Sequence, residues 1–196
     1  MTRLALLRHG PTEWNRAGRI QGSSDIALDA DALTDLSALQ LPPPWDRAAL
    51  WSSPLARAVQ TAKAVTGHAP RLATELREMH WGDWEGQRGV DLAADPGSGF
   101  RHIEDWGWDY RPPNGESPRE VWQRLQPWLA TLEGDAVAIC HIGVMRVLLA
   151  RAHGWDFAGP APFRVKRNRL FVLNLTDGAL SAEPEPVRLP PKEAAR

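Results

Sequence analysis

Two histidines follow short apolar runs of the kind that form buried strands. His9 comes after residues 4–7 and Arg8, and Gly10 follows it directly. His141 comes after the apolar residues 136–140, and a glycine follows two residues later. A neutral imidazole can attack phosphorus, and an arginine can hold phosphate oxygens through two parallel hydrogen bonds. These residue types predict phosphoryl chemistry, although solvated polar residues at an ordinary strand end are the alternative for each motif alone.

Arg57 is a third candidate for an anion site. Ser53 and Pro54 are the residue types preferred as the cap and first residue of a helix, which we predict over residues 55–65. The free N–H groups and the dipole of a helix N-terminus favour an anion, and Arg57 would add a full charge there. A surface arginine on an ordinary helix is the alternative.

Three carboxylates are candidates for a proton donor. Glu78, Asp83 and Glu85 share one segment with two tryptophans. Partial burial against such groups would raise the pKa of a carboxyl and let it donate a proton near neutral pH. Spacing does not choose between the three, and for Glu78 a solvated carboxylate paired with Arg77 is the alternative.

Cysteine and histidine usage predicts neither a disulfide nor a metal centre. Cys140 is the only cysteine, and it lies next to His141 on a predicted strand, where neighbours point to opposite faces. We therefore expect Cys140 to be a packing residue. The other four histidines lack the spacing of metal ligands. We expect no metal and no cofactor.

Size and charge limit the class of protein. The chain has 196 residues and a net charge of −1, with its charged residues dispersed. Nucleic-acid binding would require a basic face, and no apolar stretch is long enough for a signal peptide or a membrane span. We expect one cytoplasmic domain over residues 1–182, with no nucleic-acid or membrane partner; a homodimer is left open.

Apolar segments alternate with helix-like segments, which favours a three-layer α/β/α sandwich with a mostly parallel central sheet. Strands are expected at residues 4–7, 48–51, 71–73, 136–140, 170–175 and 179–182. Helices are expected at residues 12–16, 30–39, 55–65, 118–132 and 143–152. Because parallel strands end at the same edge of a sheet, His9 and His141 could share one pocket.

Two segments depart from this alternation. Residues 89–115 carry several glycines and prolines, and we predict an irregular excursion near the active site. Within it, residues 100–113 are a candidate lid in which Trp106 or Trp108 stacks on the substrate. Packing of both indoles against the domain is the alternative. Residues 183–196, rich in proline and charge, are predicted to be a surface or loose tail.

Five segments, in order, resemble the histidine phosphatase superfamily, also called the phosphoglycerate mutase-like family. They are residues 7–15 (LRHGPTEWN), 18–22 (GRIQG), 52–62 (SSPLARAVQTA), 76–86 around Glu78, and 140–146 (CHIGVMR). The resemblance extends from residue 4 to about residue 175. Any one segment is weak, whereas five in order with compatible spacing are specific.

The resemblance implies a role for each candidate residue. His9 would be the nucleophile that takes the phosphoryl group, and Glu78 would be the proton donor, which decides among the three carboxylates. The phosphate pocket would be formed by Arg8, Arg57 and His141. Two further positions usually reach the phosphate or the substrate beside it; here they are Asn15 and Gln21.

The short chain resembles the small phosphatase branch, which includes α-ribazole phosphatases and broad-specificity phosphatases. This implies hydrolysis of a small phosphorylated metabolite through a phosphohistidine. A mutase, which returns the phosphoryl group to a second hydroxyl, shares the first half-reaction and is the alternative enzyme. A phosphate-binding module without catalysis is the alternative from another class.

Overall fold

One twisted sheet organises the chain in a computed structural model that describes residues 2–192. Its seven strands run in the order β3-β2-β4-β1-β5-β6, with β7 beside β5. They are β1 (Thr2–Arg8), β2 (Ala49–Ser52), β3 (Arg71–Leu72), β4 (Asp135–Cys140), β5 (Arg169–Thr176), β6 (Ala179–Ala182) and β7 (Val187–Arg188). Strands β1 to β4 pair in parallel, and β5 is antiparallel to β1, β6 and β7. The expected mostly parallel sheet is confirmed.

Six α-helices of the described chain join these strands. They are α1 (Glu13–Arg16), α2 (Ala30–Ser37), α3 (Ala56–Thr66), α4 (Gly89–Ala94), α5 (Pro118–Leu129) and α6 (Ile142–His153). Asp29 caps α2, and Ser117 forms a capping box with Glu120 at the start of α5, as the sequence predicts. Helix α5 ends at Leu129 rather than at the expected residue 132.

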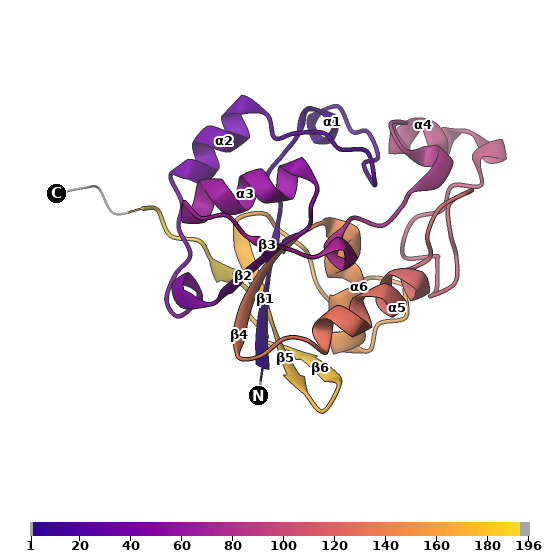
Figure 1. Cartoon of the computed structure of the whole chain (residues 1–196). Helices are drawn as coiled ribbons and strands as arrows, with labels where there is room; N and C mark the ends of the chain where they lie inside the picture. Colours follow the sequence, from indigo (N-terminus) through magenta and orange to yellow (C-terminus); the bar gives the residue numbers. More distant parts are fainter. Residues whose placement is uncertain (1, 193–196) are drawn as a thin grey trace.

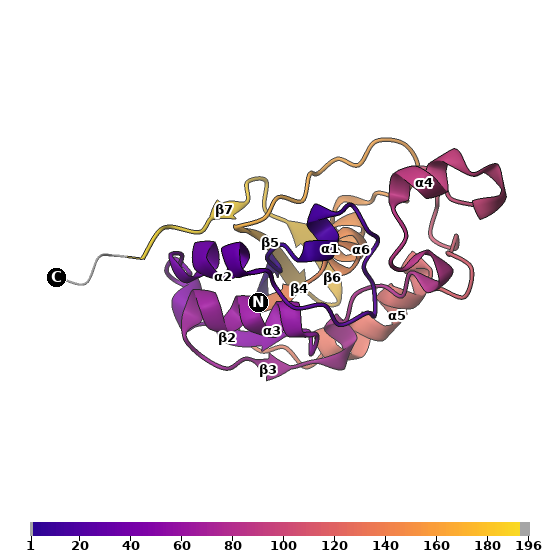
Figure 2. The same cartoon turned by 90° about the horizontal axis from the view of Figure 1, so that it is seen from above.

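Successive residues of β1 face opposite sides of the sheet, which creates two cores. Leu4 and Leu6 pack in a cluster with residues of α5 and α6. Ala5 and Leu7 pack in a second cluster with residues of α2 and α3. Figures 1 and 2 show these helix pairs on the two faces of the sheet. The three-layer α/β/α sandwich is confirmed.

The start of α3 differs from the prediction. The helix begins at Ala56, with Leu55 in the cap position, and no side chain caps it. Ser53 instead lies just beyond β2, where its hydroxyl accepts a hydrogen bond from the Leu55 amide at 3.3 Å. The hydroxyl also contacts His141, described below, so a tertiary contact replaces the expected helix cap.

The two irregular segments are partly ordered by packing. Residues 89–115 contain α4, and Trp106 is buried, with its ring 5.4 Å from that of Trp81. In the tail, β7 pairs with β5, and Leu189 is buried against the α2 and α3 layer. Residues 193–196 of the predicted tail lie outside the described residues. Over residues 2–192, no helix has the length and apolar character needed to cross a membrane.

Candidate active site

The two strand-end histidines meet at one edge of the sheet. Strands β1 and β4 are parallel neighbours, and their register pairs Arg8 with Cys140. One residue further along, the His9 amide donates to the Cys140 carbonyl at 3.0 Å, and the rings of His9 and His141 have centroids 5.1 Å apart. Pairing of the strands therefore places side chains from distant parts of the sequence in one site.

The hydrogen bonds of His9 define its tautomer. Nδ1 lies 2.6 Å from the Gly10 carbonyl oxygen, which can only accept, so Nδ1 carries the proton. Nε2 then holds a lone pair, and the side chain lines a cavity of about 320 Å³. Burial holds the pKa of His9 well below its ordinary range, and the charges of Arg57 and Arg8 lower it further. The ring is therefore neutral, with the lone pair of Nε2 free.

Arg8 faces the same cavity with unused hydrogen-bonding capacity. Its Nε is buried and has no partner within residues 2–192. Burial lowers the pKa of Arg8 to about 10, which leaves the guanidinium charged at neutral pH. A buried donor without a partner is costly, so Arg8 favours an anion in the cavity.

Arg57 lies behind the cavity rather than in its wall. The side chain is fully buried, and its Nη1 and Nη2 donate to the carbonyls of Ser24 and Gly22 at 2.8 and 2.7 Å. Its Nε donates to Nδ1 of His141 at 3.2 Å. Arg57 thus holds the loop at residues 22–24 against the site and adds positive charge beneath it.

His141 has the opposite tautomer to His9. Because Nδ1 accepts from Arg57, the proton lies on Nε2, which donates to Oγ of Ser53 at 2.8 Å. The ring is fully buried, and burial, followed by the influence of His9 and Arg57, lowers its pKa well below the ordinary range. His141 is therefore neutral and has its orientation set from both sides.

Glu78 is the carboxylate that lines the cavity. Its oxygens accept from the amides of Met79 at 2.8 Å, Gly143 at 3.1 Å and Val144 at 3.3 Å, the last two at the start of α6. A Cβ on Gly143 would lie 2.4 Å from Oε1, so this approach requires glycine. Burial raises the pKa of Glu78, and the amides and Arg57 oppose the rise. A buried acid of this kind can donate a proton.

The other two carboxylates are engaged elsewhere. Glu85 accepts hydrogen bonds from the amides of Ser23 at 2.7 Å and Ser24 at 2.9 Å. Asp83 accepts from the side chain of Asn114 at 2.9 Å. Neither lines the cavity that contains His9, so the geometry favours Glu78 as the acid.

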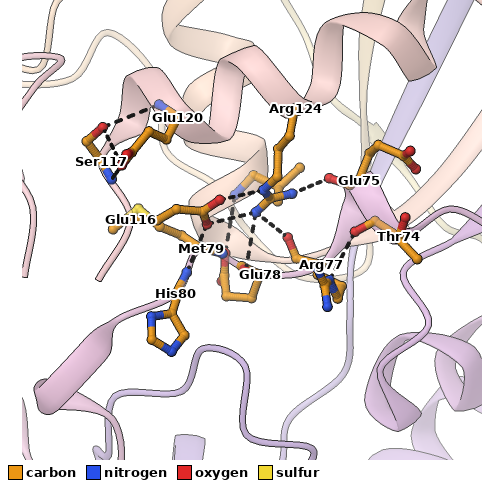
Figure 3. Close-up of polar contacts among 11 residues, drawn as sticks. Thr74, Glu75, Arg77, Glu78, Met79, His80, Glu116, Ser117, Glu120 and Arg124 are labelled. Carbon is orange, nitrogen blue, oxygen red and sulfur yellow. Dashed lines mark hydrogen bonds and ion pairs between the residues drawn. The ribbon is translucent and has the colours of Figure 1, made fainter. Parts of the chain in front are cut away.

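A network from α5 holds the backbone that carries Glu78 (Figure 3). Nε of Arg124 donates to Glu116 at 2.8 Å, and Nη1 donates to the Glu75 carbonyl. Nη2 donates to the carbonyls of Arg77 at 2.8 Å and Glu78 at 3.3 Å. One guanidinium thus ties three backbone carbonyls to a partly buried ion pair. Sequence reasoning missed Arg124, because nothing in the sequence of α5 signals contacts with residues 75–78.

Asn15 and Gln21, the two residues expected to reach the substrate, both lie in the wall of the cavity that contains His9. Oε1 of Gln21 accepts from the Thr12 hydroxyl at 3.1 Å and from Nδ2 of Asn15 at 3.4 Å. Nε2 of Gln21 is buried and has no partner in the described chain. Like Arg8, it offers a free donor to a ligand.

Further arginines that sequence reasoning did not single out reach the site, among them Arg167 and Arg146. Arg167 donates to Oδ1 of Asn15 at 2.9 Å and to the His9 carbonyl at 3.3 Å. Arg146, on the second turn of α6, lines the cavity. Arg146 ends the last matched segment, which was a usable signal, whereas Arg167 lies in a stretch without a motif.

Of the two candidate lid tryptophans, only Trp106 lines the cavity. Trp108 packs edge-on against Phe157, with ring centroids 5.1 Å apart, and beneath the guanidinium of Arg151. Phe100 and Ile103 from the same excursion also line the cavity. Over residues 2–192, no group of three or more histidine, cysteine, aspartate or glutamate side chains could hold a metal ion.

Comparison with known proteins decides the family. The family model of the histidine phosphatase superfamily (branch 1) matches residues 4–183. The chain belongs to this superfamily. A glucosyl-3-phosphoglycerate phosphatase of Mycobacterium tuberculosis is 37% identical over 135 residues, which make up 66% of this chain and only 60% of that protein. An adenosylcobalamin/α-ribazole phosphatase of Salmonella typhimurium is 29% identical over 90% of this chain and 92% of that protein.

Solved structures of relatives in this superfamily share the fold of the chain. A mycobacterial glucosyl-3-phosphoglycerate phosphatase in complex with VO3 has a TM-score of 0.77 and 27% identity, covering 92% of this chain and 96% of that chain. A protein of Thermus thermophilus described as a phosphoglycerate mutase has a TM-score of 0.71 and 34% identity, covering 92% and 97%. The relatives thus include both named phosphatases and a named mutase.

Proposed function

We propose that this chain hydrolyses small phosphomonoesters through a phosphohistidine on His9. The observation that carries the proposal is the neutral, buried His9, whose Nε2 is free for attack beside the unpartnered Nε of Arg8. Glu78, which lines the same cavity, supplies the acid. The named phosphatase relatives, which include one for α-ribazole phosphate, support a small phosphorylated metabolite as substrate.

In the first half-reaction, Nε2 of His9 attacks phosphorus and the bond to the ester oxygen breaks. Protonated Glu78 gives its proton to the leaving alkoxide, so an alcohol departs and a carboxylate remains. In the second half-reaction, Glu78 takes a proton from water as the water oxygen attacks phosphorus. The N–P bond breaks and orthophosphate is released. This step regenerates neutral His9 and protonated Glu78.

The cationic groups stabilise the charge on the transferring phosphoryl group. Arg8 lies in the cavity wall and can donate hydrogen bonds to the phosphoryl oxygens. Arg57 lies behind the cavity, where it donates to the ring of His141 and adds positive charge. Because hydrogen bonds hold Arg57 and His141 in place before substrate binds, these two groups need little rearrangement in the transition state. Catalysis then depends mainly on position and electrostatics.

Trapping of the intermediate tests this proposal. Brief incubation with a labelled phosphomonoester and an alkaline quench is expected to leave a base-stable, acid-labile label on the protein. His9→Ala is expected to abolish the label, whereas His153→Ala, at the exposed end of α6, is the matched control and keeps it. Label retained in His9→Ala would contradict the assignment of the nucleophile.

Product analysis separates hydrolysis from the alternatives. Release of orthophosphate in proportion to substrate consumed is expected for a phosphatase. An isomeric phosphate ester with little orthophosphate would indicate a mutase, the activity named for the Thermus relative. Binding without any product would indicate the phosphate-binding module.

The remaining expectations belong to the same proposal. We propose a catalytic domain over residues 1–182 that acts in the cytoplasm on a small metabolite, without a metal, a cofactor, nucleic acid or a membrane. The mass of the purified protein in solution would decide whether it forms a homodimer.

A further inference from the structure

Arg167 connects the turn that carries His9 to helix α1 from a third segment of the chain. Its Nε donates to the His9 carbonyl at 3.3 Å, and its Nη2 donates to Oδ1 of Asn15 at 2.9 Å. Arg167 lies in the loop between α6 and β5, so 158 and 152 positions of sequence separate it from these two partners. Both acceptors are neutral oxygens, and these contacts therefore do not neutralise the charge of the guanidinium.

The backbone next to Arg167 is held by the start of β5 and by the tail. Asn168 has a φ of 57°, a left-handed conformation that asparagine adopts more readily than most residues. Its carbonyl accepts from the Leu189 amide at 3.0 Å. The next residue, Arg169, begins β5 and pairs with Arg188 of β7. The side chain of Arg167 thus reaches the site from a segment with a fixed position.

The contacts of Asn15 determine which end of its side-chain amide faces Arg167. Oδ1 also accepts from the Thr12 amide at 3.2 Å, as part of the capping box of α1. A guanidinium and a backbone N–H can only donate, so the Asn15 atom that both contact must be the oxygen. Nδ2 then lies on the other side, where it donates to Oε1 of Gln21 at 3.4 Å. Arg167 and Thr12 together therefore fix the orientation of the Asn15 amide.

The same reasoning fixes the side-chain amide of Gln21. Its Oε1 accepts from Nδ2 of Asn15 and from the Thr12 hydroxyl, the latter at 3.1 Å. With its oxygen occupied, Gln21 retains Nε2, which is buried and has no partner in the described chain. Asn15 and Gln21 both line the cavity that contains His9. A buried N–H without a partner is costly, and an anion in this cavity would supply the missing acceptor.

We propose that Arg167 is a positioning residue that fixes the amides of Asn15 and Gln21 with their N–H groups available to the phosphoryl oxygens of the substrate. The orientation passes from Arg167 to Asn15 and from Asn15 to Gln21. Reversed amides would present carbonyl oxygens, which repel the oxygens of a phosphate group. Arg167 itself does not line the cavity. The inference rests on the proposed function, because it takes a phosphate ester as the ligand.

Binding of inorganic phosphate, measured by calorimetry, tests the proposal without turnover. Arg167→Met removes both hydrogen bonds and is expected to weaken phosphate binding about tenfold, the effect of losing one hydrogen bond of ordinary strength to the ligand. Lys166→Met is the matched control, because it removes a positive charge from the neighbouring exposed position. It is expected to bind phosphate as the wild type does. Unchanged binding by Arg167→Met would overturn the proposal.

A double-mutant cycle separates orientation of the amides from simple loss of charge. In an Asn15→Ala background there is no amide for Arg167 to orient. Arg167→Met is therefore expected to change phosphate binding by no more than about twofold in that background. A loss as large as in the wild-type background would show that Arg167 acts by its charge or through the His9 carbonyl, and would overturn the proposal.

The side-chain amide signals of Asn15 and Gln21 in nuclear magnetic resonance spectra give a second readout. Saturating phosphate is expected to shift both signals in the wild type, and to shift the Gln21 signal less in Arg167→Met. Lys166→Met is expected to show the wild-type shifts. Wild-type amide signals that do not respond to phosphate would overturn the inference, even if Arg167→Met does not fold.

Rates of ester hydrolysis, measured separately, distinguish failure of this inference from failure of the proposed function. A protein that hydrolyses no ester but shows the expected phosphate binding and amide shifts would contradict the phosphatase proposal and support the role of Arg167. A phosphatase whose Asn15 and Gln21 signals ignore phosphate would keep its proposed function, and the inference would be wrong.

Discussion

At the scale of single residues, His9 and His141 follow similar strands but differ in which ring nitrogen is free. His9 donates from Nδ1 to a carbonyl of its own turn, which leaves Nε2 for the substrate. His141 uses both nitrogens, one on Arg57 and one on Ser53. We infer that the first ring is the nucleophile and that the second fixes the position of the cationic group behind it.

Glu78→Gln tests the acid at the same scale. The amide cannot protonate an alkoxide, so hydrolysis of alkyl phosphates is expected to fall about a hundredfold to ten-thousandfold. An aryl phosphate with an acidic phenol needs no proton and should lose far less. Steady-state rates with both esters measure the contrast. Equal losses would mean that Glu78 is not the proton donor, and Glu85→Gln serves as the control carboxylate.

At the scale of elements, the start of α6 and the side of α5 together position the acid. The first amides of α6 bind the Glu78 carboxylate, and Arg124 of α5 binds the backbone that carries it. Neither contact reaches the substrate. Under the proposed mechanism these elements determine where Glu78 delivers its proton, and Arg124 is a positioning residue.

Arg124→Met is therefore expected to lower kcat about tenfold or more for alkyl phosphates, with little change in KM, because small displacements of a catalytic group are costly. The loss should be smaller for aryl phosphates, as for Glu78→Gln, and Arg124→Lys should recover part of it. Arg119→Met, on the same helix but paired with the exposed Asp109, is the control. A uniform loss on all esters that follows a lower melting temperature would indicate a structural role alone.

The excursion at residues 89–115 gives a second test at this scale. Trp106 lines the cavity, whereas Trp108 packs on Phe157 away from it. Trp106→Ala is expected to lower kcat/KM for bulky esters more than for small ones. Trp108→Ala is expected to lower the melting temperature without changing that ratio. If both variants lower kcat/KM by the same factor for bulky and small esters, the lid hypothesis is wrong.

At the scale of the whole molecule, burial of two neutral histidines links stability to pH. The pKa values of His9 and His141 are lowered in the folded state, so the unfolded chain binds more protons below about pH 6.5. The free energy of unfolding is therefore expected to fall as the pH drops below about 6.5, by about 1.4 kcal/mol per pH unit for each histidine. Glu78 has the opposite effect: because its pKa is raised in the folded state, its protonation increases the free energy of unfolding as the pH drops.

Urea unfolding at about pH 7.5, 6.5 and 5.5 measures this dependence. His9→Gln is expected to halve the loss on the acidic side, because one of the two histidines is removed. His68→Gln, at an exposed position beyond α3, is the control and should keep the wild-type slope. A His9→Gln slope identical to the wild type would show that His9 is protonated in the folded protein.

The sequence alone determined the features that depend on neighbours along the chain. Apolar runs and the glycines after them indicated β1 and β4, and the Ser117 capping box indicated the start of α5. The parallel arrangement then followed from the alternation of strands and helices. The five matched segments, being local patterns, were sufficient to indicate the superfamily.

Tertiary structure decided every feature that depends on contacts between distant segments. Spacing left Glu78, Asp83 and Glu85 equivalent and the family resemblance favoured Glu78, but only packing against α6 places the Glu78 carboxylate in the cavity beside His9. Serine is a residue type that often caps helices, so the sequence predicted Ser53 as the cap of α3. Pairing of β2 with β4 instead placed its hydroxyl against His141, 88 positions away. The contacts of Arg124 and the cavity beside Arg146 form only when α5 and α6 pack on the sheet. Side-chain contacts between such distant segments follow from the fold and produce no pattern in the sequence.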